Sequence, residues 1–352
     1  MRAKGSNNLV YGLWAFGIIG HFLLLHVAWA GALNERDFVA VWVAGKLAAA
    51  GHALKAYDVE ALRAAGTQIA GTTQIKLAYP YPPQALFVAV PLSLLPLWAA
   101  YVLWQVVSAA LFYVAAKPYF PRNVPAVLAI LTPAALLSML FGQVGLFFGA
   151  MWLFAFRGSS IAAAVLTFKP HLGFLAGVDV VRKRRLLITT SCAVALLSAS
   201  VLVFGLNAWK AWFLGAVAHQ FGDLTQTPFG VWQYQMVTPY LAYGLVGWVL
   251  FAIAAIVLLT RRFNVFTAAT AAFLMAPYGF HYDMTVVCLG FGLLLLVRWR
   301  EMPAWQVFIC AIAFLLPLLV VLGTWIASPI LLLGLWVQTR HDRSLPATAP
   351  PT

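Results

Sequence analysis

Residues 10–30, VYGLWAFGIIGHFLLLHVAWA, form an apolar run without a single Asp, Glu, Lys or Arg. About 20 such residues in a helix are long enough to cross the hydrocarbon core of a bilayer. Comparable runs recur almost to residue 338, and 63% of the 352 residues are hydrophobic while only 9% are charged. A water-soluble core of this length could not bury so much apolar surface. The sequence therefore predicts an all-α polytopic integral membrane protein.

The apolar runs predict about twelve transmembrane helices. We expect them at residues 10–30, 82–97, 98–116, 124–140, 143–156, 160–181, 186–206, 236–260, 265–278, 282–297, 305–320 and 325–338. Residues 1–343 would then form a single membrane domain. Residues 344–352, rich in Pro and Ala, are expected to be a disordered tail.

The formal net charge of +13 could suggest a nucleic-acid partner, but the basic residues lie in short loops between the apolar runs. Basic loops of this kind stay on the cytoplasmic side and orient the spans. The clusters at 182–185, 261–262, 298–300 and 340–343 then place both termini in the cytoplasm. Residues 31–81, 207–235 and the turn at His281 would lie on the outer face of a multi-pass protein of the cell membrane, with lipids as partners and no nucleic acid.

The N-terminal run could be mistaken for a secretory signal peptide, because Ala28-Trp29-Ala30 resembles a cleavage site. The run exceeds the roughly 7–15 residues of a signal core, which favours a retained helix. The three cysteines, Cys192, Cys288 and Cys310, lie in predicted spans without paired or metal-type spacing. We therefore expect no disulfide, no metal site and no cofactor, although the sequence leaves a divalent-cation requirement open.

The first outer segment carries an acid, Asp37, where the first predicted span meets water. In a chain with so few charges, such an acid is a candidate for chemistry. The alternative is a structural role. Asn34 could cap a helix that ends at Gly51, and Asp37, as its third residue, would then interact with the free N–H groups at the helix start.

Two further elements are expected in the same segment. Asp58 should cap a second short helix that buries Leu62 and ends at Gly66, lying on the membrane surface. Residues 79–83, YPYPP, should be extended, because each proline disfavours a helical conformation for the residue before it. This stretch would form a rigid wall.

Lys169 lies in the stretch TFKPH, residues 167–171, about halfway along the predicted span 160–181. A lysine at bilayer depth costs about 2.5–3.5 kcal/mol on insertion scales, so it must face protein, water or an anion. One alternative is a structural ion pair, with Asp179 as the acid in the same span. Pro170 removes a backbone hydrogen bond and should kink the helix here.

Three other polar sites allow two interpretations each. His281, before Tyr282 and Asp283, could orient an acid or bind a phosphate oxygen, or it could be a hydrogen-bonded loop residue. Gln143, in the break FGQVG at 141–145, could belong to a site or only cap a helix. The outer segment 207–235 could be a sugar-stacking surface or an aromatic membrane belt, formed by Trp209, Trp212, His219, Asp223, Trp232 and Tyr234.

The order of these motifs resembles glycosyltransferase family 87. The likeness runs from about residue 10 to residue 297 and rests on Asp37-Phe38, an aromatic-Gly helix, Tyr57-Asp58, the stretch 79–83, Phe141-Gly142-Gln143, Lys169-Pro170 and residues 277–283. The resemblance implies the GT-C membrane fold, with interfacial helices in the first outer loop. It also implies a catalytic acid in that loop, here Asp37, and a polyprenyl-phosphate sugar donor. Many GT-C relatives carry an acidic pair there, whereas this chain has Asp37 with Glu35 two positions earlier, so Glu35 is the alternative acid.

The residue types also fit glycosyl transfer directly. The reaction needs a base for the acceptor hydroxyl and a cation for the leaving phosphate. Asp37 can be the base, and Lys169 and His281 can bind the phosphate. A single base without a second carboxylate predicts inversion at the anomeric carbon. Residues expected to support substrate binding are Glu35, Arg36, Tyr79, Tyr81, Gln143, His171, Tyr282 and Asp283.

The sequence shows no Gly-rich phosphate loop after a strand, which favours a lipid-linked donor over a nucleotide sugar. The expected activity is transfer of a hexose or pentose, mannose or arabinofuranose, to a glycolipid or glycan acceptor at the outer face. A transporter or flippase of lipid-linked sugars is the main alternative. However, Lys169 has no counterpart in the second half of the chain, as the related halves of transporters would suggest. A noncatalytic partner in a cell-envelope complex is a third interpretation.

Overall fold

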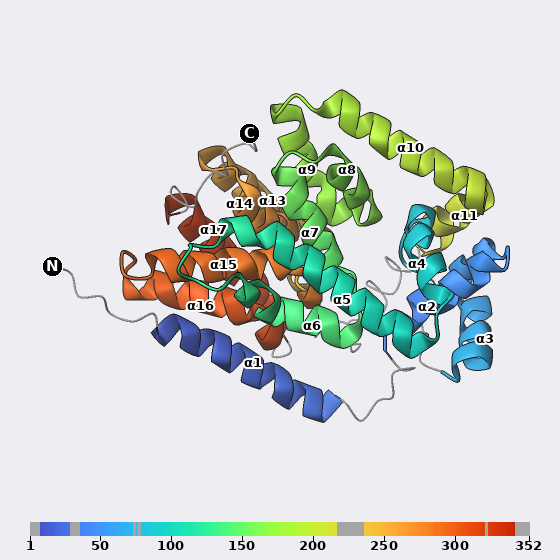
Figure 1. The fold of residues 1–352 in the computed structure, drawn as a ribbon. Helices are drawn as coiled ribbons and strands as arrows, with labels where there is room; N and C mark the ends of the chain where they lie inside the picture. The colour runs from blue at the N-terminus through green and yellow to red at the C-terminus, as the bar shows by residue number, and fades with distance from the viewer. Residues whose placement is uncertain are drawn as a thin grey trace.

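A computed structural model describes residues 8–28, 36–72, 75, 79–216, 236–320 and 323–341. Within these residues the fold is built from α-helices joined by short 3-10 turns, and an isolated bridge pairs Met236 with Phe280 (Figure 1). The helices of the N-terminal half are α1 Asn8–Ala28, α2 Phe38–Ala49, α3 Val59–Ala70, α4 Leu86–Ser93, α5 Leu97–Ala116, α6 Pro133–Phe141, α7 Gly145–Phe156, α8 Ser160–Val165 and α9 Pro170–Arg182. Those that follow are α10 Leu186–Phe204, α11 Leu206–Ala211, α13 Pro239–Arg261, α14 Val265–Met275, α15 Thr285–Arg298, α16 Ala304–Leu319 and α17 Ala327–His341.

Three helical segments in the described part are long and apolar enough to cross a membrane by length and composition. They are Leu97–Tyr119, Leu186–Phe204 and Pro239–Arg261. Shorter apolar helices pack against them, with α7 on α5 and α14 on α13. The helices α10 and α13 leave most of their apolar side chains exposed, including Leu202 and Val246, as expected for surfaces that face lipid. The all-helical membrane architecture expected from the sequence is thus observed.

The helices run between two ends of the molecule. We call the end that carries Asp37, Gln143, Lys169 and Asp283 the Asp37 end. The opposite end is called the basic end, because five helices carry an arginine there, in the last turn or directly after it. These are α7 with Arg157, α9 with Arg182, α13 with Arg261, α15 with Arg298 and α17 with Arg340. These positions agree with the predicted clustering of basic residues on one face.

The predicted span 160–181 is wrong as a single crossing, because the chain reverses direction at Lys169. Helix α8 leads away from the basic end, where α7 finishes. The turn Leu166–Phe168 follows, and α9 then returns to the basic end. There Lys183 donates to the Phe156 carbonyl oxygen (2.5 Å), and Arg185 donates to the Ala155 carbonyl oxygen (3.0 Å). Pro170 begins α9 and does not kink a continuous helix. The chain 160–182 is therefore a re-entrant hairpin with Lys169 at its tip.

The predicted span 82–97 is also wrong as a crossing. Helix α4 has only eight residues, about 12 Å of rise. Both of its flanks lie at the Asp37 end, since Tyr81 bonds to Gln143 and Tyr101 bonds to the Met139 carbonyl oxygen. Instead of crossing, α4 packs against α2, where Trp42 donates to the Leu95 carbonyl oxygen.

Counting neither α4 nor the hairpin, which leaves the basic end and returns to it, the described chain passes between the two ends ten times. The passages are α1, α5, α6 with the preceding turn Ala126–Leu131, α7, α10, α13, α14, α15, α16 and α17. One consequence concerns Gln143. The predicted order of spans, in which residues 82–97 cross, would place the turn at Gln143 opposite Asp37, whereas the structure brings both residues to the same end.

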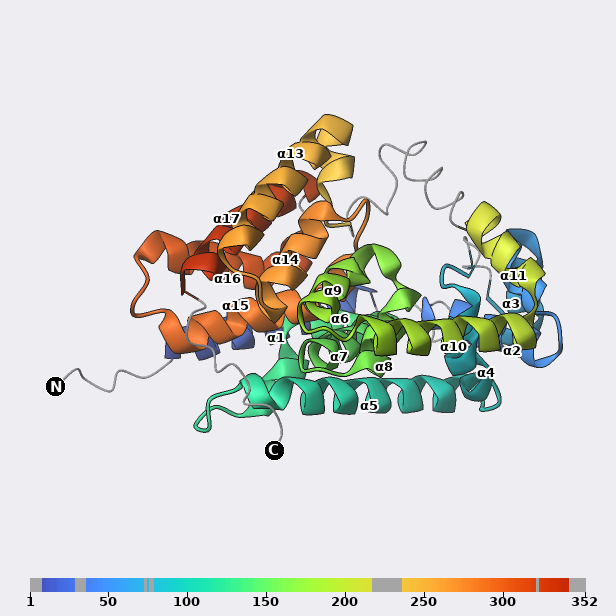
Figure 2. The same cartoon turned by 90° about the horizontal axis from the view of Figure 1, so that it is seen from above.

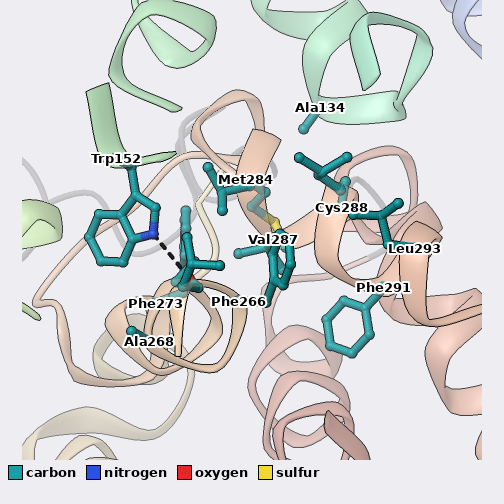
Figure 3. Close-up of a cluster of buried hydrophobic side chains, with 14 of the residues drawn as sticks. Ala134, Trp152, Phe266, Ala268, Phe273, Met284, Val287, Cys288, Phe291 and Leu293 are labelled. Atoms are coloured by element: carbon teal, nitrogen blue, oxygen red, sulfur yellow. Dashed lines mark hydrogen bonds between the residues drawn. The ribbon is translucent and has the colours of Figure 1, made fainter. Parts of the chain in front are cut away.

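The core that supports the Asp37 end is centred on α14 and α15, whose residues are almost all buried. Figure 3 shows Phe266, Met284 and Phe291 in this cluster, with the Trp152 indole N–H donating to the Val265 carbonyl oxygen at 3.0 Å. Burial on all sides is expected for short central helices that are apolar all round. This packing fixes the turn His281–Asp283, which immediately precedes α15.

The first outer segment follows the predictions in part. Asp58 caps α3 by accepting from the Ala61 N–H at 2.9 Å, and Leu62 is buried, as predicted. The helix does not end at Gly66 but continues to Ala70, because the glycine in the left-handed cap conformation is Gly71, with a φ of +63°. Helix α11 lies beside this segment in both views (Figures 1 and 2). Just beyond it, Trp212 donates to the Pro80 carbonyl oxygen at 3.1 Å.

Candidate active site

Asp37 immediately precedes α2 and makes no capping hydrogen bond with its side chain. The alternative in which it is the third residue of a helix capped by Asn34 is therefore wrong for Asp37, and Asn34 lies outside the described residues. The carboxylate turns instead to a distant segment, where its Oδ2 accepts from the Gln143 amide nitrogen at 2.7 Å. Burial raises the pKa of Asp37, while the Gln143 hydrogen bond and the charge of Lys169 lower it.

Gln143 follows the end of α6 in a sharp turn. Gly142 has a φ of +69°, and a Cβ there would lie 2.6 Å from the Phe38 Cβ. The Gln143 side chain has two partners, because its Oε1 also accepts from the Tyr81 hydroxyl at 2.9 Å. The alternative that Gln143 only caps a helix is wrong, because Val144 is the N-cap of α7 and the Gln143 amide joins two segments of the site.

Arg36 contacts the same turn as Asp37. Its guanidinium donates to the Leu140 carbonyl oxygen and lies over the Tyr101 ring, 5.8 Å from the ring centroid. The Tyr101 hydroxyl in turn donates to the Met139 carbonyl oxygen at 2.7 Å. Two consecutive residues, Arg36 and Asp37, are therefore both anchored to the turn at the end of α6.

Lys169 forms a buried ion pair with Asp283. Its ammonium lies 2.7 Å from Oδ1 and 2.8 Å from Oδ2 of the carboxylate, whose side chain has no solvent exposure. The partner proposed from sequence, Asp179, instead pairs with Lys183 and Arg185 at the basic end. The reason is the reversal at Lys169, which carries the two residues to opposite ends of the molecule.

Tyr81 connects the two charged groups. Its ring lies under the Lys169 ammonium, 5.5 Å from the centroid, while its hydroxyl bonds to the Gln143 amide that holds Asp37. Tyr81 comes from the extended stretch 79–83, where Tyr79 is fully buried and packs edge-on against it at 5.4 Å. The predicted rigid wall therefore supplies the residue that links acid and cation.

The other predicted site residues gather around this pair. His281 and Tyr282 are buried in the turn with Asp283, and the Phe141 ring lies 5.8 Å from the His281 ring. Tyr282 also faces the Lys169 ammonium, at 5.6 Å from its centroid. His171 packs on Tyr278 at 3.9 Å, on the hairpin beyond Lys169. Glu35 lies outside the described residues.

An apolar hollow opens beside the tyrosines of the wall. Its lining comes from α2, α4, α5, α7 and the tip of the hairpin and consists of Val41, Tyr79, Tyr81, Ala85, Val88, Leu92, Trp104, Val144, Phe147, Phe148 and Phe168. Sequence reasoning missed Trp104, Phe147 and Phe168, because aromatic residues in apolar runs look like ordinary core residues. It also missed Tyr101, whose position at the start of a predicted span was its only signal.

Within the described residues no group of three or more His, Cys, Asp and Glu side chains could hold a metal ion. Of the six residues noted in the second outer segment, Trp209 and Trp212 are described and pack edge-on at 5.7 Å. The remaining four lie outside the described residues.

Comparison with curated proteins and with solved structures gave no significant match. The sequence model of glycosyltransferase family 87 matches residues 79–281, which is more than half of the chain. The matched region includes Tyr81, Gln143, Lys169 and His281, so most of the segments that meet at the site belong to it. Together with its apolar helices, this match identifies the chain as a membrane protein that belongs to glycosyltransferase family 87.

Proposed function

We propose that this glycosyltransferase moves a hexose or pentose, mannose or arabinofuranose, from a polyprenyl-phosphate donor to a glycolipid or glycan acceptor. The observation that carries the proposal is the link through Tyr81. It joins the Asp37 carboxylate to the Lys169 ammonium beside an apolar hollow. Acid, cation and lipid-compatible surface are the three features that such a transfer needs.

In the proposed reaction Asp37 is the general base. Its carboxylate takes the proton of the acceptor hydroxyl as that oxygen attacks the anomeric carbon of the donor sugar. The bond from this carbon to the phosphate oxygen breaks, and polyprenyl phosphate leaves as an anion. One displacement by one base inverts the anomeric configuration, because no covalent sugar intermediate forms.

We assign the donor phosphate to Lys169 and His281. An ammonium has three N–H groups, and the two hydrogen bonds to Asp283 leave one for a phosphate oxygen. Because Asp283 balances the charge of Lys169, a second positive group is needed near the leaving phosphate. Arg36, next to Asp37, can supply it along with His281. Glu35, Tyr79, Tyr81, Gln143, His171 and Tyr282 support substrate binding in this proposal.

A lipid-linked donor is favoured by the lining of the hollow, which is almost wholly apolar. A nucleotide would need polar groups for its base and ribose, whereas an isoprenoid chain needs none. The extracytoplasmic face is favoured by the basic end, because basic residues prefer the cytoplasmic side and the site lies at the other end. We place the enzyme in the cell membrane on this basis.

The test is a donor screen with the purified full-length protein in detergent and in sealed vesicles. Labelled polyprenyl-phosphate mannose and polyprenyl-phosphate arabinofuranose are offered with a mixed glycolipid acceptor extract, and Asp37→Asn is the matched control. Label moving from donor to acceptor only with the unchanged protein supports the proposal. Movement of intact donor across the vesicle wall would instead indicate a flippase, and neither outcome would indicate a noncatalytic partner. We propose no cofactor, so transfer should persist in EDTA.

A further inference from the structure

The chemistry of the Gln143 side chain fixes which way its amide faces. A carboxylate accepts hydrogen bonds and cannot donate them, so the NH2 group must face Asp37. The amide oxygen then needs a donor, and the Tyr81 hydroxyl is 2.9 Å away. Burial raises the pKa of Tyr81 well above its usual value, so this hydroxyl stays protonated and donates. The hydrogen bonds from Tyr81 to Gln143 to Asp37 therefore run in one direction.

Both intermediate residues are held by their own surroundings. The Gln143 backbone N–H donates to the Ser138 carbonyl oxygen at 2.9 Å, and the Ser138 hydroxyl donates back to the Gln143 carbonyl oxygen at 3.2 Å. The Tyr81 carbonyl oxygen accepts from the buried Tyr57 hydroxyl at 3.2 Å. These contacts fix the backbone from which each of the two side chains projects, and they are independent of Asp37.

We propose that Tyr81 and Gln143 are positioning residues that orient the Asp37 carboxylate and hold it in its ionised form. Tyr81 fixes the amide, the amide binds Oδ2, and Oδ1 is left to receive a proton. Among the residues that the structure describes, Gln143 supplies the side-chain hydrogen bond to this carboxylate. The role of Oδ1 rests on the proposed function, whereas the effect of Gln143 on ionisation does not.

The test therefore follows the ionisation of Asp37 without any substrate. Infrared difference spectroscopy of the full-length protein, titrated with acid, detects the carbonyl stretch of a protonated carboxyl group. The part of the signal that Asp37→Asn removes belongs to Asp37. Gln143→Met keeps the shape of the side chain but removes the N–H, and we expect the titration midpoint to rise by about one to two pH units. The direction is upward because a hydrogen bond to the charged form is lost.

The hydrogen bonds from Tyr81 through Gln143 to Asp37 are called the relay below. Tyr81→Phe removes one oxygen atom and keeps the ring, so it tests the relay even where Gln143→Met is poorly folded. We expect a smaller rise, because the amide is still present but free to turn. The double variant should shift no further than Gln143→Met alone, since Tyr81 acts through Gln143. Tyr119→Phe is the matched control, because it removes the hydroxyl of a buried tyrosine at the basic end, away from the relay, and should leave the midpoint in place.

An unmoved midpoint in Gln143→Met and Tyr81→Phe, or shifts that add in the double variant, would overturn the relay. So would the absence of any signal that Asp37→Asn removes. Failure of the proposed function is distinguishable from these results. If Asp37→Asn still transfers sugar in the donor screen while the midpoints shift as expected, the relay stands and the assignment of Asp37 as base falls.

Discussion

A carboxylate at the start of a helix usually serves the helix, and Asp37 does not. Its hydrogen bond goes to Gln143, 106 positions away, so its removal should affect chemistry more than folding. Asp37→Asn still accepts a hydrogen bond but cannot take a proton. We expect transfer to fall by about 10²- to 10⁴-fold, the range for a lost proton-transfer group, with little change in melting temperature. Initial rates and thermal unfolding in detergent measure the two effects.

Glu35→Gln is the control for this prediction, because Glu35 is the alternative acid in the same segment. Near-normal transfer by Glu35→Gln together with loss in Asp37→Asn assigns the base to Asp37. The reverse result would move the assignment by two residues. If both variants transfer normally, this segment does not supply the base.

Variants of the Lys169–Asp283 pair can separate an effect on stability from an effect on donor binding. Lys169→Met leaves the buried Asp283 charge without its partner, which should cost about 3–5 kcal/mol of unfolding free energy. Lys169→Met combined with Asp283→Leu removes both charges and should recover most of that loss. If Lys169 also binds the donor phosphate, the double variant is folded but has lost donor affinity. Thermal unfolding and binding of labelled polyprenyl-phosphate sugar are the measurements.

Two outcomes would contradict this view. Full donor affinity in the folded double variant would make the pair purely structural. A double variant as unstable as Lys169→Met would show that the charge of Asp283 is not the source of the instability.

At the scale of elements, the approach of α7 to the turn His281–Asp283 depends on one glycine. A Cβ at Gly145 would overlap the Tyr282 carbonyl oxygen, so Gly145→Ala must push the turn away from α7. We expect a loss of about 1–3 kcal/mol in unfolding free energy, the usual range for overpacking. The matched control is Gly177→Ala in α9, where a Cβ meets nothing within 4 Å and the better helix propensity should add up to about 1 kcal/mol. Equal melting temperatures for the two variants would contradict the close contact.

The sequence predicted the residue ranges of the helices much better than their directions through the molecule. The expected ranges 98–116 and 143–156 agree with α5 and α7 within two residues, because apolar length and flanking breaks mark them. The reversal at Lys169 was not predictable, since a proline within an apolar run is equally compatible with a kink. What decides the direction is Arg185 reaching the end of α7, a contact between segments that no local pattern records.

The same reasoning explains the predicted parts of the site. Asp37, Gln143 and Lys169 were recognised because a polar residue in an apolar chain is conspicuous. The ion pair of Lys169 with Asp283 was missed because Asp179 is nearer in sequence. Which acid pairs with Lys169 is decided by the reversal of the chain at Lys169, which places Asp179 at the basic end. The link through Tyr81 was missed because it forms only when the turn at Gln143 and the stretch 79–83 lie at the same end of the molecule. The predicted order of spans placed them at opposite ends.

For the whole molecule, the finding that residues 82–97 do not cross makes a prediction about residue 123. The predicted order of spans places the loop after α5 on the outer face, whereas the structure places it at the basic end, where Tyr119 packs against Phe266. In a background with Cys192 replaced, a cysteine at exposed Asn123 should resist an impermeant thiol reagent added outside. Glu60→Cys on α3 should react and Glu301→Cys should not, which provides both controls. Reaction at Asn123→Cys would show that residues 82–97 do cross, and reaction at Glu301→Cys with Glu60→Cys protected would invert the orientation.

The re-entrant hairpin has a consequence for biosynthesis. Lys169 leaves the ribosome 114 residues before Asp283. At about 5–20 residues per second, the lysine waits on the order of 6 to 23 seconds before its native partner exists. During that interval the hairpin tip carries an ammonium that is costly to bury in lipid. The Lys169–Asp283 pair can therefore form only after α14 and the turn before α15 have been made, so the final contact of the hairpin tip depends on the C-terminal half of the chain.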